Sequence, residues 1–341
     1  MSASLREVAD RVGVSLATAS RALNGKGGVK PETRQRVLEV AQELQFSFSM
    51  AARGLVTTKT ETICYVVHQR HAPFDGDPFY PIIMHGVEAE LRRHDYHLLL
   101  STISDEQFKD VSAFKPVAEQ RVDGVLLAGP DISPRFILAL KQLEVPVLLI
   151  DNVLENGTVD AVYSDDIQGG RLATRHLLEH GHSKIVALLG PEAWASSAHR
   201  GQGYRETMIA AGLAPHIFHA EGTTLETGSS MMQQALQAIP DLTAIFAAND
   251  AMALGAMRVL AQQKRRVPED VAVIGFDDTN YSTLVDPPLS TVRIFKHEMG
   301  RAAARRMLSM LTDENGGPAM QTVLATELVP RRSCGCEDQP L

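Results

Sequence analysis

Over its first 44 residues the chain carries apolar side chains at helical spacing and no strand pattern. The first expected helix opens on a capping box from Ser4 to Glu7 and ends at Gly13. A second helix should follow Ser15, a good N-cap residue, and a third should begin near Pro31, because proline suits the first helical position. Two short helices joined through a tight glycine turn are typical of a helix-turn-helix.

From residue 62 onward the pattern changes to short apolar runs separated by amphipathic helical stretches. Such runs are typical of βαβ units, whose parallel strands are buried on both faces. Eight runs exceed what one open sheet usually holds, so we predict an α/β fold with two lobes, each a doubly wound parallel sheet. The runs are TICYVV, YHLLLS, DGVLLAG, PVLLID, DAVYS, KIVALLG, TAIFAAN and VAVIGF.

Four parts follow from these patterns. They are an all-α head at residues 1–45, a linker with a short helix at 46–60, a two-lobed α/β domain at 61–332 and a tail at 333–341.

The head and linker also differ from the rest of the chain in net charge. The first 60 residues hold nine Lys and Arg against five Asp and Glu, a net charge of +4, although the whole chain carries −8. A basic head on an acidic body fits a protein whose head contacts nucleic acid phosphates.

Composition and cysteine usage exclude several other classes. Apolar residues make up 44% of the chain and charged residues 22%, which is typical of an ordinary soluble protein. No run of about 18 apolar residues indicates a membrane span, and the N-terminus has charges where a signal peptide needs its apolar stretch. We therefore expect no membrane association and a cytoplasmic location. Three cysteines cannot build a disulfide framework.

Two residue pairs resemble fragments of metal sites. Cys334 and Cys336 flank a glycine near the C-terminus, but two thiols without a second pair or adjacent histidine fall short of a four-ligand zinc set. His176 and His180 have the i, i+4 spacing of a helical metal pair, yet no glutamate follows in the HExxH sense. We predict no metal and no cofactor from these patterns.

The head carries the most specific signal. VADRVGVSLATASRALNG followed by PETRQRVLEVAQEL resembles the lactose-repressor and galactose-repressor family, and the resemblance extends over essentially the whole chain. It implies that Leu16, Ala17 and Arg21 read bases in the major groove. Phosphate contacts would come from Ser15, Thr18 and Ser20. From the pattern alone, the segment could also be a structural three-helix cap whose hydroxyl groups only cap helices.

The same resemblance makes the linker a hinge helix that forms on DNA in the minor groove. Leu55 sits where the family places a leucine that wedges open the central base step, and Arg53 could reach phosphate or groove edges. Two residues depart from the family pattern, since Phe48 replaces a common proline and Lys30 replaces a helix-capping serine. Gly54 lowers helix propensity by about 1 kcal/mol relative to alanine, so we expect a disordered hinge in the absence of DNA.

Later segments resemble the same family and, more distantly, periplasmic sugar-binding proteins. They are RLATRHLLEHGHSKIVALLGP, AANDAMALGAM, VPEDVAVIGFDD and DPPLSTV. The family's organisation places an N-terminal lobe at about 61–161 and 291–320 and a C-terminal lobe at about 162–290 and 321–332. Residues 61–332 would then bind an effector and form the dimer.

Ligands of such folds bind at strand carboxyl ends. By the family pattern, Arg200, Asn249 and Asp277 converge on the effector, and Phe79 and Trp194 line the cleft. We expect Asp250 to be a helix N-cap. Arg200 could instead form an ion pair between the lobes, and Trp194 could be a plain hydrophobic lid. Thr224 stands where some relatives place an aromatic residue.

These observations predict a sequence-specific transcription repressor that acts as a homodimer on palindromic operator DNA. A small molecule in the cleft, preferably a sugar, would control operator affinity. A secreted sugar carrier would need a signal peptide in place of the head. An enzyme of Rossmann type would need a GxGxxG loop or a nucleophile beside a base, and the sequence offers neither, so we expect no catalysis. The effector's identity, and whether it releases DNA or tightens binding, are not specified by the residues.

Overall fold

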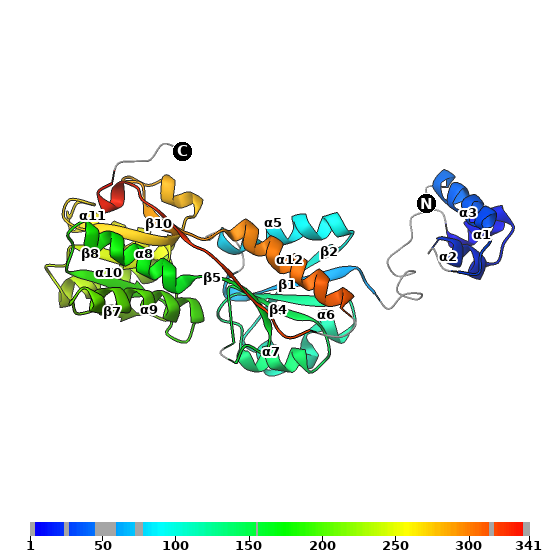
Figure 1. The fold of residues 1–341 in the computed structure, drawn as a ribbon, viewed down its shortest axis with the longest axis horizontal. Coiled ribbons are helices and arrows are strands. Elements are labelled where there is room, and N and C mark those ends of the chain that lie inside the picture. Colours follow the sequence, from blue (N-terminus) through cyan, green and yellow to red (C-terminus); the bar gives the residue numbers. More distant parts are fainter. Residues whose placement is uncertain are drawn as a thin grey trace. The chain divides into compact units, whose positions relative to one another are not determined.

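The computed structural model describes residues 4–23, 27–44, 59–71, 78–154, 156–313 and 317–336. The chain forms two compact units, Met1–Thr60 and Glu61–Leu341 (Figure 1). No helix among the described residues combines the length and apolar character needed to cross a bilayer.

The first unit contains three helices, α1 (Leu5–Val12), α2 (Leu16–Leu23) and α3 (Pro31–Glu43). The capping box at Ser4 is present, and Gly13 ends α1 with φ 77°, a left-handed conformation that glycine adopts without strain. Lys30 precedes α3 and gives it no side-chain cap. The core is small and built largely from alanine and valine, which lets the three helices approach closely: Val8, Ala9, Ala19, Ala22, Val37 and Ala41.

Two six-stranded sheets form the second unit, and they confirm the predicted α/β class. The first has the order β11-β5-β4-β3-β1-β2 and contains β1 (Thr62–His68), β2 (His97–Ile103), β3 (Gly124–Ala128), β4 (Val147–Ile150), β5 (Asp160–Ser164) and β11 (Gln321–Leu324). The second has the order β12-β10-β9-β8-β6-β7 and contains β6 (Ile185–Leu189), β7 (His216–His219), β8 (Ala244–Ala247), β9 (Ala272–Asp277), β10 (Ser290–Arg293) and β12 (Glu327–Val329). All described pairings are parallel except that of β10 with β12.

Helices cover the sheets. In the first lobe, α5 (Phe79–Leu91) and α12 (Lys296–Thr312) lie over one face, and α6 (Lys115–Ala118) and α7 (Pro134–Lys141) lie on the other (Figure 1). Alternate residues of β1 therefore enter two separate cores: Tyr65 packs with the first pair of helices, whereas Val66 packs with the second. In the second lobe, α8 (Asp166–Glu179) pairs with α9 (Ala195–Ala210), and α10 (Leu225–Ala238) pairs with α11 (Asp250–Gln262).

The sheet pairing corrects the expected lobe boundaries. The family's organisation predicts residues 321–332 in the C-terminal lobe, but β11 pairs with β5 in the first sheet and only β12 pairs in the second. The boundaries near residues 161 and 290 also fall inside β5 and β10, which belong wholly to the first and second sheets. Hydropathy does not reveal which sheet β5, β10, β11 and β12 join, because each of these strands has only three to five residues.

The close pairing of α5 with α12 depends on one glycine in each helix that faces the backbone of the other helix. A Cβ atom at Gly300 of α12 would lie 2.1 Å from the carbonyl oxygen of Ile83, and one at Gly86 of α5 would lie 2.3 Å from that of His297. Distances this short cannot be relieved by a side-chain rotation, since the neighbouring atoms belong to backbone.

Gly300→Ala should therefore lower the free energy of unfolding of the second unit by about 1–3 kcal/mol, the usual cost of overpacking. Urea unfolding of the purified protein would measure the change. Gly222→Ala is the matched control, because its Cβ would meet the nearest atom, Thr227 Oγ1, at an ordinary 3.8 Å. Equal midpoints for Gly300→Ala and wild type would contradict the proposed packing.

Candidate functional site

The first unit presents one exposed side of α2, which carries both apolar and polar residues. Ser15 caps this helix, as predicted, because its Oγ accepts a hydrogen bond of 3.1 Å from the backbone N–H of Thr18. Leu16 is 45% exposed although it is a large apolar residue, and Ala17 and Arg21 are exposed beside it. Arg21 Nε donates to the carbonyl of Ala17 at 3.2 Å, which directs the guanidinium along the outer face of the helix.

Two further predicted residues of this face, Thr18 and Ser20, are half-buried. The side of α2 opposite Leu16 and Arg21 is buried through Ala19 and Ala22. The predicted hinge residues, Arg53 and Leu55, lie outside the described residues, as does Phe48.

All five predicted effector residues line one pocket of the second unit. Phe79 is the first residue of α5 in the N-terminal lobe, while the other four belong to the C-terminal lobe. Trp194 precedes α9, Arg200 lies within it, Asn249 precedes α11, and Asp277 ends β9. The pocket also contains Tyr80, the aromatic neighbour of Phe79, together with His71 and Asp151, which the sequence did not indicate.

Arg200 is the cation at the centre of this pocket. Its side chain is 7% exposed, and its Nε donates to Asp166 Oδ1 at 2.8 Å. Its Nη1 lies 3.6 Å from Asp277 Oδ1, and the guanidinium stacks 3.9 Å above the ring of Phe276. Burial would lower the pKa of Arg200, but the surrounding carboxylates raise it, so the residue stays charged. Asp166 and Asp277 come from α8 and β9 of its own lobe, and these ion pairs are therefore not the expected alternative of a bridge between lobes.

Asp277 occupies a conformation that indicates local strain. Its φ of 104° lies in a region that residues other than glycine rarely adopt. Lys296, the first residue of α12, holds it there by donating from its buried Nζ to the carbonyl of Asp277 and, at 3.2 Å, to that of Asp278. A helix of one lobe thus contacts the backbone of a pocket residue in the other.

Asp151 is a buried pocket residue that the sequence-based prediction did not include. It directly follows β4, at the end of the run PVLLID. Asp277 was selected because it follows an apolar strand, and the same criterion applied to this run would have identified Asp151. Tyr80 donates a 3.2 Å hydrogen bond to its Oδ2, and Oδ1 has no partner among the described residues. Burial, reinforced by the nearby carboxylate of Asp166, raises the pKa of Asp151 to about 7.

The raised pKa gives a prediction for stability. Because the pKa of Asp151 is 3.8 in its ordinary state and about 7 in the folded protein, the folded state holds the extra proton between these values. This contribution to stability is present at low pH and is lost as pH rises through 7. The unfolding free energy of wild type minus that of Asp151→Asn should fall by about 1.4 kcal/mol per pH unit between roughly pH 5 and 6.5. Urea unfolding across this range tests it, and parallel pH profiles would contradict it.

The structure corrects the expected N-cap of α11, although Asn249 also lines the pocket as predicted. Asn249, not Asp250, is the N-cap, since its Oδ1 accepts from the backbone N–H of Met252 at 2.9 Å. Asp250 is instead buried and accepts hydrogen bonds from Thr279 and Thr291, which fix the loop after β9. An asparagine and an aspartate are equally good N-caps, so the sequence could not decide between adjacent positions.

A wider cavity of about 690 Å³ continues from this pocket. The two share His71, Tyr80, Trp194 and Thr223. Thr224 lines the wide part and caps α10 by accepting from the N–H of Thr227 at 3.2 Å, so the position that some relatives fill with an aromatic residue serves here as a helix cap.

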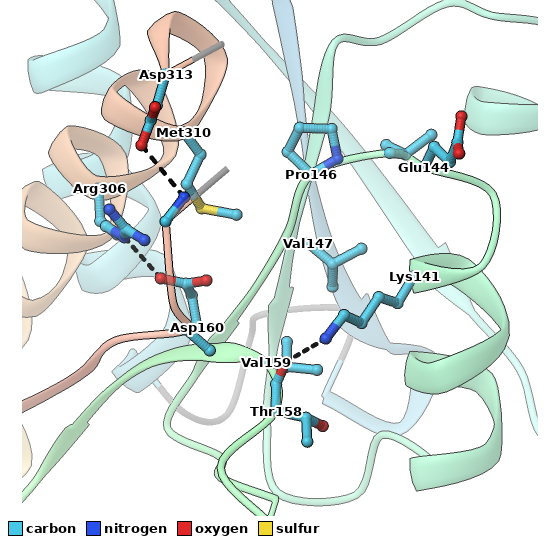
Figure 2. A pocket seen from close by; sticks show the side chains of 13 residues that line it. Lys141, Glu144, Pro146, Val147, Thr158, Val159, Asp160, Arg306, Met310 and Asp313 are labelled. Atoms are coloured by element: carbon cyan, nitrogen blue, oxygen red, sulfur yellow. Dashed lines mark hydrogen bonds and ion pairs between the residues drawn. The ribbon is translucent and has the colours of Figure 1, made fainter. Parts of the chain in front are cut away.

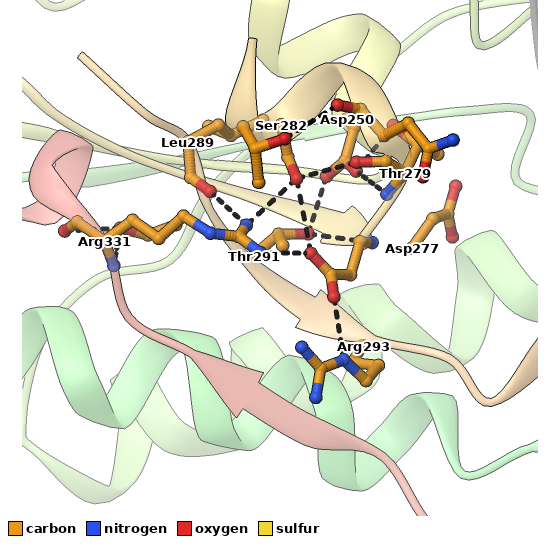
Figure 3. A network of polar contacts seen from close by, with 12 residues as sticks. Asp250, Asp277, Thr279, Ser282, Leu289, Thr291, Arg293 and Arg331 are labelled. Atoms are coloured by element: carbon orange, nitrogen blue, oxygen red, sulfur yellow. Dashed lines mark hydrogen bonds and ion pairs between the residues drawn. The ribbon is translucent and has the colours of Figure 1, made fainter. Parts of the chain in front are cut away.

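A polar network anchors the loop after β9 behind the pocket (Figure 3). Arg331 donates to Asp278 at 2.6 Å and Arg293 donates to the other oxygen of the same carboxylate at 2.7 Å. These bonds lower the pKa of Asp278 despite its burial. The side chain of Asp277 points away from the network, toward the pocket.

A second hollow, of about 300 Å³, lies at the amino ends of β4 and β5 (Figure 2). Its basic groups already have partners: Arg306 Nε donates to Asp160 Oδ1 at 2.6 Å, and Lys141 donates to the carbonyl of Thr158. Ligands of doubly wound sheets bind at the opposite, carboxyl ends of the strands. The pocket around Arg200 is therefore the candidate ligand site.

Comparison with known proteins agrees with this architecture. Residues 4–48 match the family model of bacterial regulatory proteins, lacI family, and residues 174–334 match the periplasmic binding protein-like domain. The HTH-type transcriptional regulator CelR of Thermobifida fusca is 36% identical over 334 residues, which cover 96% of this chain and 97% of CelR. The HTH-type transcriptional repressor PurR of Aliivibrio salmonicida is 31% identical over 317 residues, covering 92% and 93%.

Solved structures extend the likeness to the whole fold. A transcriptional regulator CelR–cellobiose complex has a TM-score of 0.73 at 33% identity and covers 97% of this chain and 99% of its own. The lac repressor dimer bound to operator and the anti-inducer ONPF has a TM-score of 0.83 at 25% identity and covers 98% and 99%.

The helix-turn-helix head and the two-lobed domain define a DNA-binding transcriptional regulator with a periplasmic-binding-protein-like effector domain. The chain belongs to the LacI family, which confirms the resemblance inferred from its sequence.

Proposed function

We propose that this protein is a transcription repressor whose operator affinity is controlled by a sugar bound between the lobes. The observation that carries the proposal is the pocket around Arg200, where charged and amide groups from separate strand ends converge beside aromatic rings. Such a combination of few fixed polar groups and apolar walls is what small-molecule sites require.

The polar groups suit hydroxyl groups. Asp277 and Asp151 can each accept hydrogen bonds from hydroxyl groups, and the guanidinium of Arg200 donates hydrogen bonds in a fixed plane. Asn249 uses its amide to cap α11 and to donate to the carbonyl of Thr223 at 2.9 Å, so its remaining donor and acceptor capacity is held in one orientation. Trp194 and Tyr80 add flat apolar surfaces for the C–H face of a sugar ring.

The size of the cavity favours a sugar of more than one ring. The narrow part beside Arg200 opens into about 690 Å³ lined by Trp194, Leu254 and Tyr281. One ring in the polar part and a second against these side chains would use both regions. The solved complex of CelR with cellobiose supports this choice, and we propose a disaccharide of this kind as the effector.

We further propose that the protein binds a palindromic operator as a homodimer. A single head offers too few contacts for tight specific binding, and a two-fold dimer doubles them. The lac repressor dimer on operator, at a TM-score of 0.83, supports this assembly. In it, Leu16, Ala17 and Arg21 would read each half-site, Ser15, Thr18 and Ser20 would contact phosphate, and Arg53 and Leu55 would act in the hinge.

A fluorescence titration tests the ligand class. Trp194 is the chain's one tryptophan, so its emission reports on the pocket without interference. Cellobiose and longer cello-oligosaccharides should change the emission saturably, whereas glucose should bind more weakly because it fills one region only. Purines serve as the competing class, and Asp286→Ala, an exposed aspartate of the same lobe, serves as the control variant. Saturable binding of a purine with no response to any sugar would contradict the proposal.

A further inference from the structure

The two residue pairs that separately fell short of a metal site meet in the folded chain. Cys334 Sγ lies 3.2 Å from His176 Nε2, and Cys336 Sγ lies 3.5 Å from the same nitrogen. Cys336 Sγ is also 3.3 Å from His180 Nε2. His176 and His180 come from the end of α8, and the cysteines come from the C-terminal segment, more than 150 residues later.

We propose that His176, His180, Cys334 and Cys336 form a zinc site of the Cys₂His₂ type. A tetrahedral zinc ion with bonds of about 2.0–2.3 Å places neighbouring ligand atoms roughly 3.3–3.8 Å apart. The three sulfur–nitrogen distances are close to these values, and the donor atoms of His176, Cys334 and Cys336 all lie within 4.8 Å of one another. His180 Nε2 already approaches Cys336 Sγ but not every other donor, so a rotation of the His180 side chain has to complete the set. Two thiolates and two imidazoles in this arrangement select zinc over the hard cations calcium and magnesium.

The surroundings orient the donor atoms. His180 Nδ1 lies 2.9 Å from the backbone carbonyl of His176, and a hydrogen bond there places the proton on Nδ1 and leaves the Nε2 lone pair for a metal. Gly335, with φ 92°, provides the left-handed turn that brings the thiols on both sides of it toward the same helix end.

Hydrogen bonds and burial fix the C-terminal segment that carries the two cysteines. Ser333, next to Cys334, donates to the carbonyl of Val273 at 2.6 Å and accepts from the N–H of Ser290 at 2.8 Å. Cys334 itself is only 2% exposed. The site is therefore built on two rigid elements, and a bound ion would fasten the C-terminal segment to the end of α8. Four protein ligands leave no open position, which indicates a structural role.

Metal analysis of the full-length protein tests the proposal. Protein kept reduced, stripped with a chelator and then dialysed against Zn²⁺ should retain one ion per chain. Cys336→Ser and His180→Gln remove ligands that are not fully buried, so these variants should fold. Competition with a chromogenic chelator would measure Zn²⁺ affinity. Loss of a residue that only supports a ligand weakens metal binding roughly 10- to 100-fold, and each of these variants, which loses a ligand itself, should weaken Zn²⁺ binding by more than that. Cys64→Ala and His182→Gln, a buried thiol elsewhere and a neighbouring histidine, should leave it unchanged.

Substitution with Co²⁺ adds a direct reading of the ligands. Wild type should show the intense visible bands of tetrahedral cobalt together with thiolate charge-transfer absorption, and Cys336→Ser should lose about half of the charge-transfer intensity because one of two thiolates is gone. Zn²⁺ should also raise the thermal midpoint of wild type and not that of Cys336→Ser. Wild type that retains no more Zn²⁺ than Cys336→Ser, or a cobalt spectrum without thiolate bands, would overturn the proposal.

Discussion

Arg21→Ala should weaken binding to the specific operator by about 1–3 kcal/mol per half-site and relax the base preference at one position in each half-site. Arg21 is exposed on α2, and its guanidinium can donate two parallel hydrogen bonds to a guanine edge. Because a symmetric dimer would use the residue twice, the loss should approach twice the single value. Selection of binding sites from randomised palindromes, followed by anisotropy titrations, would measure both effects.

Arg6→Ala is the matched control for this prediction. Arg6 is an exposed arginine of α1. Its substitution by alanine removes the same charge from the head and leaves α2 unchanged. Its loss should weaken binding to all sequences alike and reduce the salt dependence, as expected for a phosphate contact. If Arg21→Ala behaves in the same way as Arg6→Ala, the assignment of base contacts to α2 is wrong.

Asp277→Ala should abolish the effect of the effector on operator affinity and leave dimerisation and DNA binding intact. Asp277 lines the pocket, and removal of its carboxylate leaves Arg200 paired with Asp166 at 2.8 Å, so the buried cation keeps a partner. The lost response should equal the whole allosteric coupling, about 1–3 kcal/mol or a 5- to 150-fold change in operator affinity. Anisotropy titrations with and without cellobiose measure it.

Asp286→Ala again provides a control, because Asp286 is a solvent-exposed partner of Arg332. A variant at Asp277 that still responds to the effector like wild type would exclude this residue from the ligand site. The behaviour of Asp277→Ala also reports the direction of control: a protein that stays on DNA indicates an inducer, which we propose here, and a protein that stays off indicates a corepressor.

The longest apolar runs allowed the fold to be predicted from sequence. Runs such as KIVALLG and VAVIGF form strands that are buried along their whole length, and such strands have a hydropathy signal independent of their neighbours. The strands β7, β10, β11 and β12 were missed because they have three or four residues with polar side chains among them, as in HIFH and QTVL. Their pairing depends on tertiary contacts, which no local pattern records.

The ligand site could be predicted only in part. Arg200, Asn249 and Asp277 could be selected because family motifs surround them, and they do line one pocket. The role of Asp151 depends on Arg200 and Tyr80, which lie 49 and 71 positions away, and is visible only in the folded chain. The cluster of Cys336 with His176 shows the same limit, since each pair was judged against its own sequence neighbours and the fold brings them together.

Operator binding as a function of effector concentration tests the central claim most directly. A labelled operator selected by the protein itself would be titrated at a series of cellobiose concentrations, with Trp194 emission followed in the same samples. Coupling requires the ligand to prefer one arrangement of the lobes, so operator affinity should fall 5- to 150-fold as cellobiose is added, an expected coupling of about 1–3 kcal/mol. The cellobiose concentration at half of this fall should equal the concentration at half of the emission change. Saturation of the Trp194 signal at unchanged operator affinity would contradict the account.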